Sequence, residues 1–250
     1  MIILKTATEL EGIREACKIS ALALRAGVEA VREGITTKEI DAVVRKTIEG
    51  YGAKPAFLGY GGFPGSACIS VGDEVIHGIP SANRRIKYGD IVSIDVGAIF
   101  KGYYADNAYT VACGEVSEEL AQLMERTKHS LQLGIKAAVV DARVGDISHS
   151  IGSYLEGFGY GVVRDFVGHG CGKKLHEEPE IPNYGSAGRG ARLAAGMTLA
   201  IEPMVNLVGH EVHIAKDGWT VLTRSGSPSV HFEHTIAVTD NGPEILTEVN

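Results

Sequence analysis

The sequence lacks the features that mark several protein classes. None of its apolar runs approaches membrane-spanning length, and residues 1–5 are too short to serve as a signal peptide. Its four cysteines form no C-x-x-C pair, which favours reduced thiols in the cytoplasm. The net charge of −7 argues against the basic face that nucleic-acid binding requires. We therefore expect a cytoplasmic protein with neither a membrane nor a nucleic acid as its partner.

Helix-start residues and the spacing of apolar residues predict four helices and several short strands. Thr8, Thr36, Ser117 and Asp146 are the expected helix caps. The predicted helices cover residues 8–32, 36–50, 117–140 and 146–158, and the predicted strands cover residues 67–71, 75–80, 92–100, 103–112, 161–165, 197–206, 219–223 and 231–239.

Two helices and a group of strands thus occur twice along the chain. A hydrophobic content of 44% over 250 residues is ample for a buried core. No linker separates the repeats, so we expect one domain, residues 1–250, with structural halves of about 1–113 and 114–250. The predicted fold class is α+β, with two helical layers that cover one curved, mostly antiparallel sheet.

The segment 92–112 reads as a hairpin that places two acids near each other. With Lys101-Gly102 as a two-residue loop, Asp95 lies opposite Ala108, and Asp106 is the diagonal neighbour on the same face. Two carboxylates on one face repel each other unless a cation lies between them. The alternative is a half-exposed hairpin whose two acids face solvent.

Three stretches of the second half carry residues of matching chemistry. His169 lies between glycines, Glu202 ends an apolar run and Glu233 begins another. Each could be an exposed strand end, but charged residues are rarely buried unless they are paired or bind a metal. Four carboxylates with one imidazole suit Mn²⁺, Fe²⁺, Co²⁺ or Zn²⁺. Two such ions can share a water and polarise a carbonyl, which predicts amide hydrolysis without a serine or cysteine nucleophile.

Eight motifs together resemble the type I methionine aminopeptidases, a peptidase family with the pita-bread fold. They keep the order of that family and are spread over most of the chain. The motifs are His77-Gly78-Ile79-Pro80, Ile94-Asp95-Val96-Gly97, Asp106, Gly168-His169-Gly170, His176-Glu177-Glu178-Pro179, Ile201-Glu202-Pro203-Met204-Val205-Asn206, Lys216-Asp217-Gly218-Trp219-Thr220 and Phe232-Glu233-His234-Thr235. The resemblance implies a pseudo-twofold repeat of helix pairs over a curved sheet.

The resemblance also implies a site with two divalent metal ions. Asp95 would chelate one ion, Asp106 and Glu233 would bridge, and His169 and Glu202 would complete the other. Glu202 would also move the proton of the metal-bridged water.

Further residues would hold the substrate. His77 would bind the substrate backbone on the leaving-group side, and His176 would donate to the scissile carbonyl. An apolar slot for the methionine side chain would be lined by Tyr60, Phe63, Cys68, Leu175 and Trp219.

The implied activity is removal of the initiator methionine from nascent polypeptides when the second residue is small and uncharged. The family's role further implies a monomer with transient ribosome contact. Family members commonly bind a monovalent cation through backbone atoms of the loop before Phe232. Pro228 and His231 differ from the residues usual in that loop, so the resemblance does not decide whether this cation site is present. Two alternatives are a proline-peptide aminopeptidase of the same fold and a non-catalytic binding module. The proline-peptide aminopeptidase is disfavoured because we expect no N-terminal domain of the kind found in prolidases. The binding module is disfavoured because all five predicted metal ligands are present.

Overall fold

Four α-helices form within residues 1–248, the part of the chain that this computed structural model describes. Their bounds are Ala7–Ala30 for α1, Thr37–Gly50 for α2, Glu118–Ala137 for α3 and Val144–Glu156 for α4. Thr36 and Ser117 cap α2 and α3 as predicted. None of the described helices is both long and apolar enough to cross a lipid bilayer.

The expected caps of α1 and α4 are wrong. The cap of α1 is Thr6, whose hydroxyl accepts the N–H of Glu9 while the Glu9 carboxylate accepts the N–H of Thr6. Thr8 competes for this role in the sequence but lies inside the helix. Asp146 is the third residue of α4, where its carboxylate accepts the N–H of Arg143 at 2.7 Å. An acid in the first turn thus satisfies a free backbone donor without being the cap itself.

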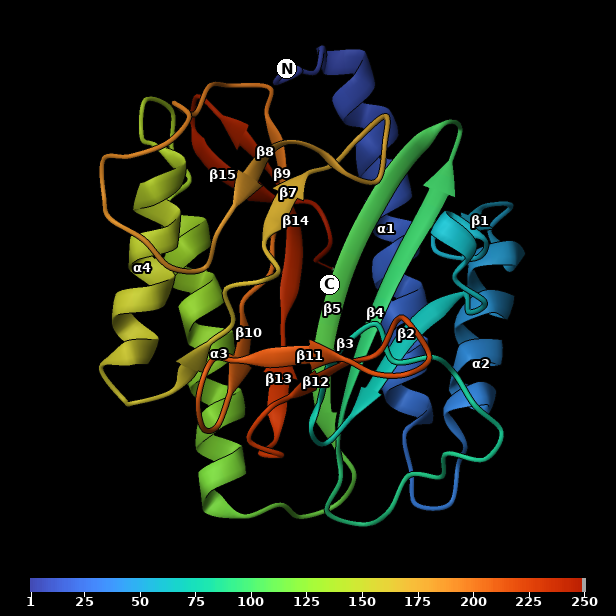
Figure 1. Ribbon diagram of the computed structural model, residues 1–250. Helices are drawn as coiled ribbons and strands as arrows, with labels where there is room; N and C mark the ends of the chain where they lie inside the picture. Colours follow the sequence, from blue (N-terminus) through green and yellow to red (C-terminus); the bar gives the residue numbers. More distant parts are fainter. Residues whose placement is uncertain (249–250) are drawn as a thin grey trace.

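The main sheet has nine strands in the order β1-β4-β5-β14-β9-β7-β8, with β2 beside β4 and β15 beside β14 (Figure 1). Every pairing within it is antiparallel, so the α+β class is confirmed. The strands are β1 (Lys54–Pro55), β2 (Ala67–Val71), β4 (Ile91–Phe100), β5 (Tyr103–Ala112), β7 (Gly168–Gly170), β8 (Glu177–Ile181), β9 (Thr198–Ile201), β14 (Glu233–Thr239) and β15 (Gly242–Ile245).

Two small three-stranded sheets accompany the main one. The first has the order β13-β10-β6 and the second β11-β12-β3. Their bounds are Glu74–Ile76 for β3, Gly161–Val162 for β6, Met204–Asn206 for β10, Val212–Ile214 for β11, Val221–Thr223 for β12 and Ser229–His231 for β13. Two strands predicted as continuous are therefore broken, one at Glu202-Pro203 and the other at Phe232. Proline offers no N–H to a ladder, which explains the first break.

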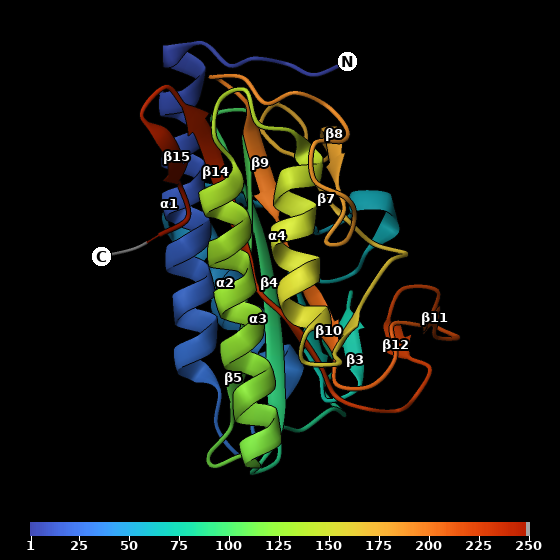
Figure 2. The ribbon, with the colours of Figure 1, turned by 90° about the vertical axis from the view of Figure 1, so that its left-hand side faces the viewer.

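The helices lie on one face of the main sheet, and the strands β3, β11 and β12 lie beyond its other face (Figure 2). Val44 of α2 packs in one buried cluster with Ile94 of β4, and Ile151 of α4 packs in another with Leu199 of β9. Because successive strand residues point to opposite faces, burying Ile94 under the helices directs Asp95 to the opposite face.

The hairpin register is confirmed. Lys101 and Gly102 form a two-residue turn, and both have positive φ, 50° and 83°. Asp95 is paired with Ala108, and Asp106 is paired with Gly97. The aspartates therefore lie on one face as diagonal neighbours.

Thr110 of β5 ties this hairpin to β13. Its hydroxyl donates to the carbonyl oxygen of His231 at 2.8 Å and accepts the N–H of His231 at 2.9 Å. The same hydroxyl lies 2.8 Å from that of Ser93, and all three side chains are buried. One hydroxyl group therefore joins the first half of the chain to the second.

Thr110→Val is expected to destabilise the protein by about 1–3 kcal/mol, because two buried backbone groups of His231 lose this partner. Urea unfolding of the purified variant measures the change. Thr47→Val is the matched control, since the Thr47 hydroxyl bonds only the Val43 carbonyl within α2 and is partly exposed. Equal stability of the two variants would contradict the role given to Thr110.

Candidate active site

One face of the main sheet carries a row of side chains from four strands. Cys68 on β2 pairs with Asp95 on β4, Asp95 pairs with Ala108 on β5, and Ala108 pairs with Glu233 on β14. Directly paired residues of antiparallel strands project to the same face, so Cys68, Asp95 and Glu233 share it. Asp106 lies two residues before Ala108 on β5, so its side chain projects to the same face of the sheet. Strand register alone therefore gathers these groups.

The same alternation brings in the two remaining predicted ligands. Ala200 on β9 pairs with both His169 on β7 and Thr235 on β14. Thr235 follows Glu233 by two residues, so His169 projects to the face that carries Glu233. Glu202 comes two residues after Ala200, just past the end of β9, and lies beside His169.

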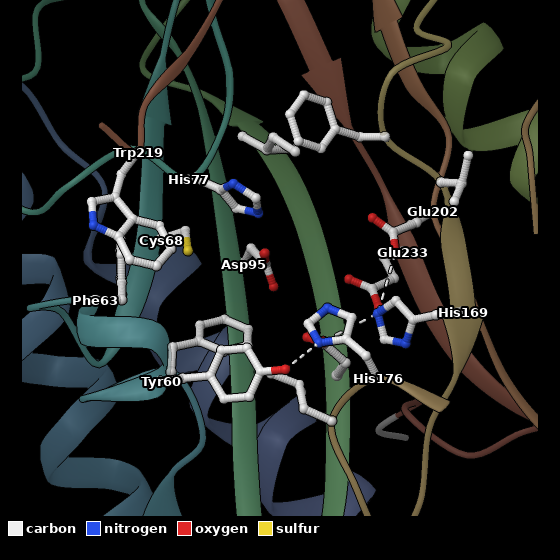
Figure 3. A pocket seen from close by; sticks show the side chains of 16 residues that line it. Tyr60, Phe63, Cys68, His77, Asp95, His169, His176, Glu202, Trp219 and Glu233 are labelled. Carbon is white, nitrogen blue, oxygen red and sulfur yellow. Dashed lines mark hydrogen bonds and ion pairs between the residues drawn. The ribbon is translucent and has the colours of Figure 1, made fainter. Parts of the chain in front are cut away.

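These side chains line one cavity of about 180 Å³. Figure 3 shows Tyr60, Phe63, Cys68 and Trp219 on one side of it, with His169, Glu202 and Glu233 on the other. All twelve site residues predicted from the sequence contribute to its wall. The full lining is Phe57, Tyr60, Phe63, Cys68, Ile76, His77, Asp95, Asp106, Phe166, Val167, His169, Leu175, His176, Glu202, Trp219 and Glu233.

The acidic side of the cavity has the geometry of a metal site. His169 Nε2 lies 3.8 Å from Asp106 Oδ2 and 3.5 Å from Glu202 Oε1. One ligand atom each from Asp106, His169 and Glu233 falls within 4.8 Å of the others. Nδ1 of His169 bonds the carbonyl oxygen of Gly170 at 2.9 Å, so it carries the proton and leaves the Nε2 lone pair facing the acids.

Buried oxygens without partners show that the acids fit a cation. Within residues 1–248, Asp95 Oδ1, Asp106 Oδ1 and Glu233 Oε1 are buried and have no hydrogen-bond partner. A buried polar atom without a partner costs free energy, and a buried charge costs more. Divalent cations bound between these oxygens would satisfy all three at once.

Burial shifts the pKa of each acid upward. Burial raises the pKa of Asp95 to about 7, with repulsion from Glu202 adding to it, and burial likewise raises the pKa of Glu202 to about 7. Burial and the neighbouring carboxylates hold the pKa values of Asp106 and Glu233 well above their usual range. Burial therefore favours the protonated form of each acid unless a cation lies between them.

The opposite side of the cavity is an apolar slot. Phe63 and Trp219 meet edge to face, with ring centroids 5.2 Å apart. Phe63, Cys68 and Leu175 are buried in one cluster, against which Trp219 packs. Tyr60 lies at the rim on the short 3₁₀-helix η1 (Tyr60–Gly62) and is 46% exposed. The slot suits an unbranched apolar side chain.

Two histidines flank the space between the acids and the slot. His77 follows β3 with a φ of 59°, a strained conformation for a residue other than glycine. Its ring meets that of Phe166 at 5.7 Å and that of Trp219 at 6.5 Å. His176 Nδ1 lies 2.8 Å from the hydroxyl oxygen of Tyr60. Both rings are thereby oriented by aromatic neighbours.

Sequence reasoning missed several residues around this cavity. Phe57 and Phe166 line it. The available signals were the many glycines and aromatic residues in the stretch 55–65 around Phe57, and the position of Phe166 just before the Gly168 motif. His231 Nε2 is buried 3.5 Å from Glu202 Oε2, although the sequence marks His231 only as a departure. Asn183 donates to the carbonyl oxygen of Glu202 at 3.0 Å, and no sequence pattern points to it.

Comparison with known proteins agrees with this geometry. The profile of metallopeptidase family M24 matches residues 11–240. The chain belongs to metallopeptidase family M24. Membership implies the use of a divalent metal ion, and the cluster of Asp106, His169 and Glu233 is the candidate site for it.

This M24 member resembles methionine aminopeptidases over its whole length. It is 53% identical to the methionine aminopeptidase of Clostridium acetobutylicum over 99% of both chains, and 47% identical to methionine aminopeptidase 1 of Bacillus subtilis over 100% of both. The crystal structure of the Thermotoga maritima methionine aminopeptidase matches all of both chains with a TM-score of 0.98 and 45% identity. The prolidase of Pyrococcus horikoshii matches with a TM-score of 0.81 and 27% identity over 65% of that chain. The predicted pita-bread fold is confirmed.

Glu233→Gln is expected to change how the stability of the metal-free protein depends on pH. The raised folded-state pKa of Glu233 means that the native state binds more protons than the unfolded state above about pH 4.5. Stability is therefore lost as the pH rises through that window, and the glutamine variant is spared this loss. As the pH rises from 5 to 8, the variant should therefore become more stable relative to wild type. Each unit by which folding raises the pKa of Glu233 corresponds to about 1.4 kcal/mol of this difference.

Urea unfolding with a chelator present, at both pH values, measures this gain. Glu156→Gln is the control because that side chain is 53% exposed, and it should leave the pH dependence of wild type unchanged. Added Mn²⁺ should stabilise wild type more than Glu233→Gln. A pH dependence identical in wild type and Glu233→Gln would show that Glu233 does not carry a buried proton.

Proposed function

We propose that the protein is a metallo-aminopeptidase that removes N-terminal methionine when the second residue is small and uncharged. The observation that carries the proposal is a cavity with a cluster of acids on one side and the Phe63–Cys68–Trp219 slot on the other. A thioether side chain packs favourably against aromatic rings, so methionine suits the slot. The full-length similarity to proteins named methionine aminopeptidase supports the same activity.

The metal site is proposed to hold two divalent ions. Asp95, Asp106, His169, Glu202 and Glu233 would hold these ions. The oxygen-rich donor set suits Mn²⁺, Fe²⁺, Co²⁺ or Zn²⁺. When bound, the ions supply a lowered pKa for an attacking water and polarise the scissile carbonyl.

Glu202 is the proposed proton carrier of the reaction. Its carboxylate would take a proton from the attacking water and return it to the leaving amine. Its backbone is held by Asn183, and its Oε2 lies beside His231. These two contacts keep the carboxylate aimed at the reacting atoms.

The two histidines are proposed to hold the scissile bond. With the Tyr60 hydroxyl donating to Nδ1, His176 carries its proton on Nε2 and can donate to the carbonyl oxygen as negative charge develops there. Burial lowers the pKa of His77 to about 4, so this ring is neutral at pH 7 and bonds the substrate backbone without adding charge.

The cellular setting follows as part of the proposal. The substrates would be the N-termini of nascent polypeptides in the cytoplasm, met during transient contact with the ribosome. The protein would act as a monomer of one catalytic domain, and the residues proposed for metal, proton transfer and substrate all come from one chain, so the site needs no partner subunit.

A peptide series tests the proposed specificity. With Mn²⁺ or Co²⁺ added, the protein is expected to release methionine from Met-Ala-Ser and hardly from Met-Lys-Ser, because the pocket beside the new N-terminus would limit the size of the second side chain. Released methionine is measured by chromatography across the metal series. Faster cleavage of a peptide with proline second and no N-terminal methionine would favour a proline-peptide aminopeptidase. No cleavage with metal bound would favour a binding module.

Glu202→Gln is expected to abolish most turnover while leaving part of the metal binding. The amide keeps the size of the side chain but cannot take up the proton, a contribution typically worth about 10²–10⁴ in rate. Initial rates on Met-Ala-Ser and calorimetric titration with Mn²⁺ measure the two effects separately. A variant with full activity would remove Glu202 from the proposed chemistry.

A further inference from the structure

The loop between β7 and β8, residues 171–176, carries two groups of the proposed site. Leu175 lines the slot, and His176 is the proposed donor to the scissile carbonyl. Within the loop the Gly172 N–H bonds the Lys174 carbonyl at 3.0 Å, and from outside the Tyr104 N–H bonds the Gly172 carbonyl at 2.7 Å. The position of His176 therefore depends on what holds this loop in place.

Glu177 holds the loop at its C-terminal end. One carboxylate oxygen, Oε1, accepts the N–H of Lys173 at 2.7 Å and that of Lys174 at 3.0 Å. The other, Oε2, lies 2.5 Å from Lys5 Nζ, and the side chains of Lys5 and Glu177 are only 2% and 3% exposed. The carboxylate of Glu177 thus connects the loop to the segment that precedes α1.

Lys5 is itself held rigidly. Its N–H bonds the carbonyl of Gly196, just before β9, at 2.8 Å, and its Nζ bonds the Ile3 carbonyl at 3.1 Å. The loop packs so closely on the Lys5 side chain that a Cβ built on Gly172 would lie 2.7 Å from Lys5 Cε. Burial alone would raise the pKa of Glu177, but the hydrogen bonds from Lys5 and the loop bring this pKa below its usual value. The pair is therefore charged and tightly packed.

We propose that Lys5 is a positioning residue that sets the place of His176 and Leu175 through Glu177. The proposal rests on the proposed function of His176. Removing the ammonium leaves the buried carboxylate without its counterion, and the carboxylate then has to reach solvent or gain a proton. Either change releases the N–H groups of Lys173 and Lys174 and shifts the side chains that follow them.

A second ion pair on the same loop provides a matched control. Lys173 Nζ lies 2.5 Å from Glu9 Oε1 at the start of α1, but the Lys173 side chain is 52% exposed. The Glu9 side chain is 19% exposed, so water reaches this pair, and ion pairs that water screens contribute little. Loss of this pair should therefore leave His176 in place.

The test compares Lys5→Met with Lys173→Met in the full-length, Mn²⁺-loaded protein. With Met-Ala-Ser, Lys5→Met is expected to lower kcat by about tenfold to a hundredfold, since displacement of a catalytic group by roughly 1 Å costs about that much. Its affinity for Mn²⁺, measured by calorimetry, should equal that of wild type because the five proposed ligands lie outside the loop. Lys173→Met should match wild type in both measurements.

Two further readouts separate positioning from general destabilisation. The side-chain resonances of ¹⁵N-labelled His176 should shift in Lys5→Met and stay unchanged in Lys173→Met. The double variant Lys5→Met/Glu177→Gln leaves no buried charge and keeps an oxygen for the loop N–H groups. The kcat of this double variant should lie between those of Lys5→Met and wild type. If Lys5→Met alone does not fold, the double variant takes its place in the comparison.

Several outcomes would overturn the proposal. The first is a kcat of Lys5→Met equal to that of wild type, and the second is a loss of kcat in Lys173→Met as large as that in Lys5→Met. The third is a change in the Mn²⁺ affinity of Lys5→Met that accounts for its loss of kcat. The fourth is a double variant with the kcat of wild type. Wild-type protein that fails to release methionine would instead contradict the proposed function, so the two failures are distinguishable.

Discussion

Mutual repulsion among buried carboxylates is the constraint on which the site depends. Asp95, Asp106, Glu202 and Glu233 face one another, Asp106 and Glu233 buried and the other two partly buried, and three of them keep an oxygen with no hydrogen-bond partner within residues 1–248. Such an arrangement is stable only with protons or cations between the oxygens. The same oxygens are therefore the candidate ligands of a cation, and they favour protonated carboxyl groups when no cation is bound.

The sheet makes this arrangement possible by joining two halves of the chain. The hairpin β4–β5 supplies both aspartates, while β14, the end of β9 and β7 supply Glu233, Glu202 and His169. The helices cover the opposite face of the sheet, and the acid-bearing face looks toward β3, β11 and β12 (Figure 2). Thr110 locks the two halves together at β13, close to the reacting groups. Stability of the domain and geometry of the site thus rest on shared contacts.

Support for the site extends beyond the groups that would touch substrate. The Tyr60 hydroxyl lies against Nδ1 of His176, the Gly170 carbonyl fixes the proton of His169 on Nδ1, and Asn183 holds the backbone of Glu202. Side chains that fix the rotamer and tautomer of catalytic groups are what give such sites their precision. The Lys5–Glu177 pair belongs to this supporting set, although neither of its side chains lines the cavity.

Local patterns in the sequence determined the helices, the hairpin register and the identity of the acid cluster. A two-residue loop and a side-chain period of two suffice to place Asp95 and Asp106 on one face. The sequence does not distinguish the two possible N-terminal caps of α1, because Thr6 and Thr8 both precede a glutamate by three residues. Only the tertiary structure decided that His231, Asn183 and Lys5 support the site. Their partners lie far along the chain, and long-range strand pairing leaves no mark in local spacing.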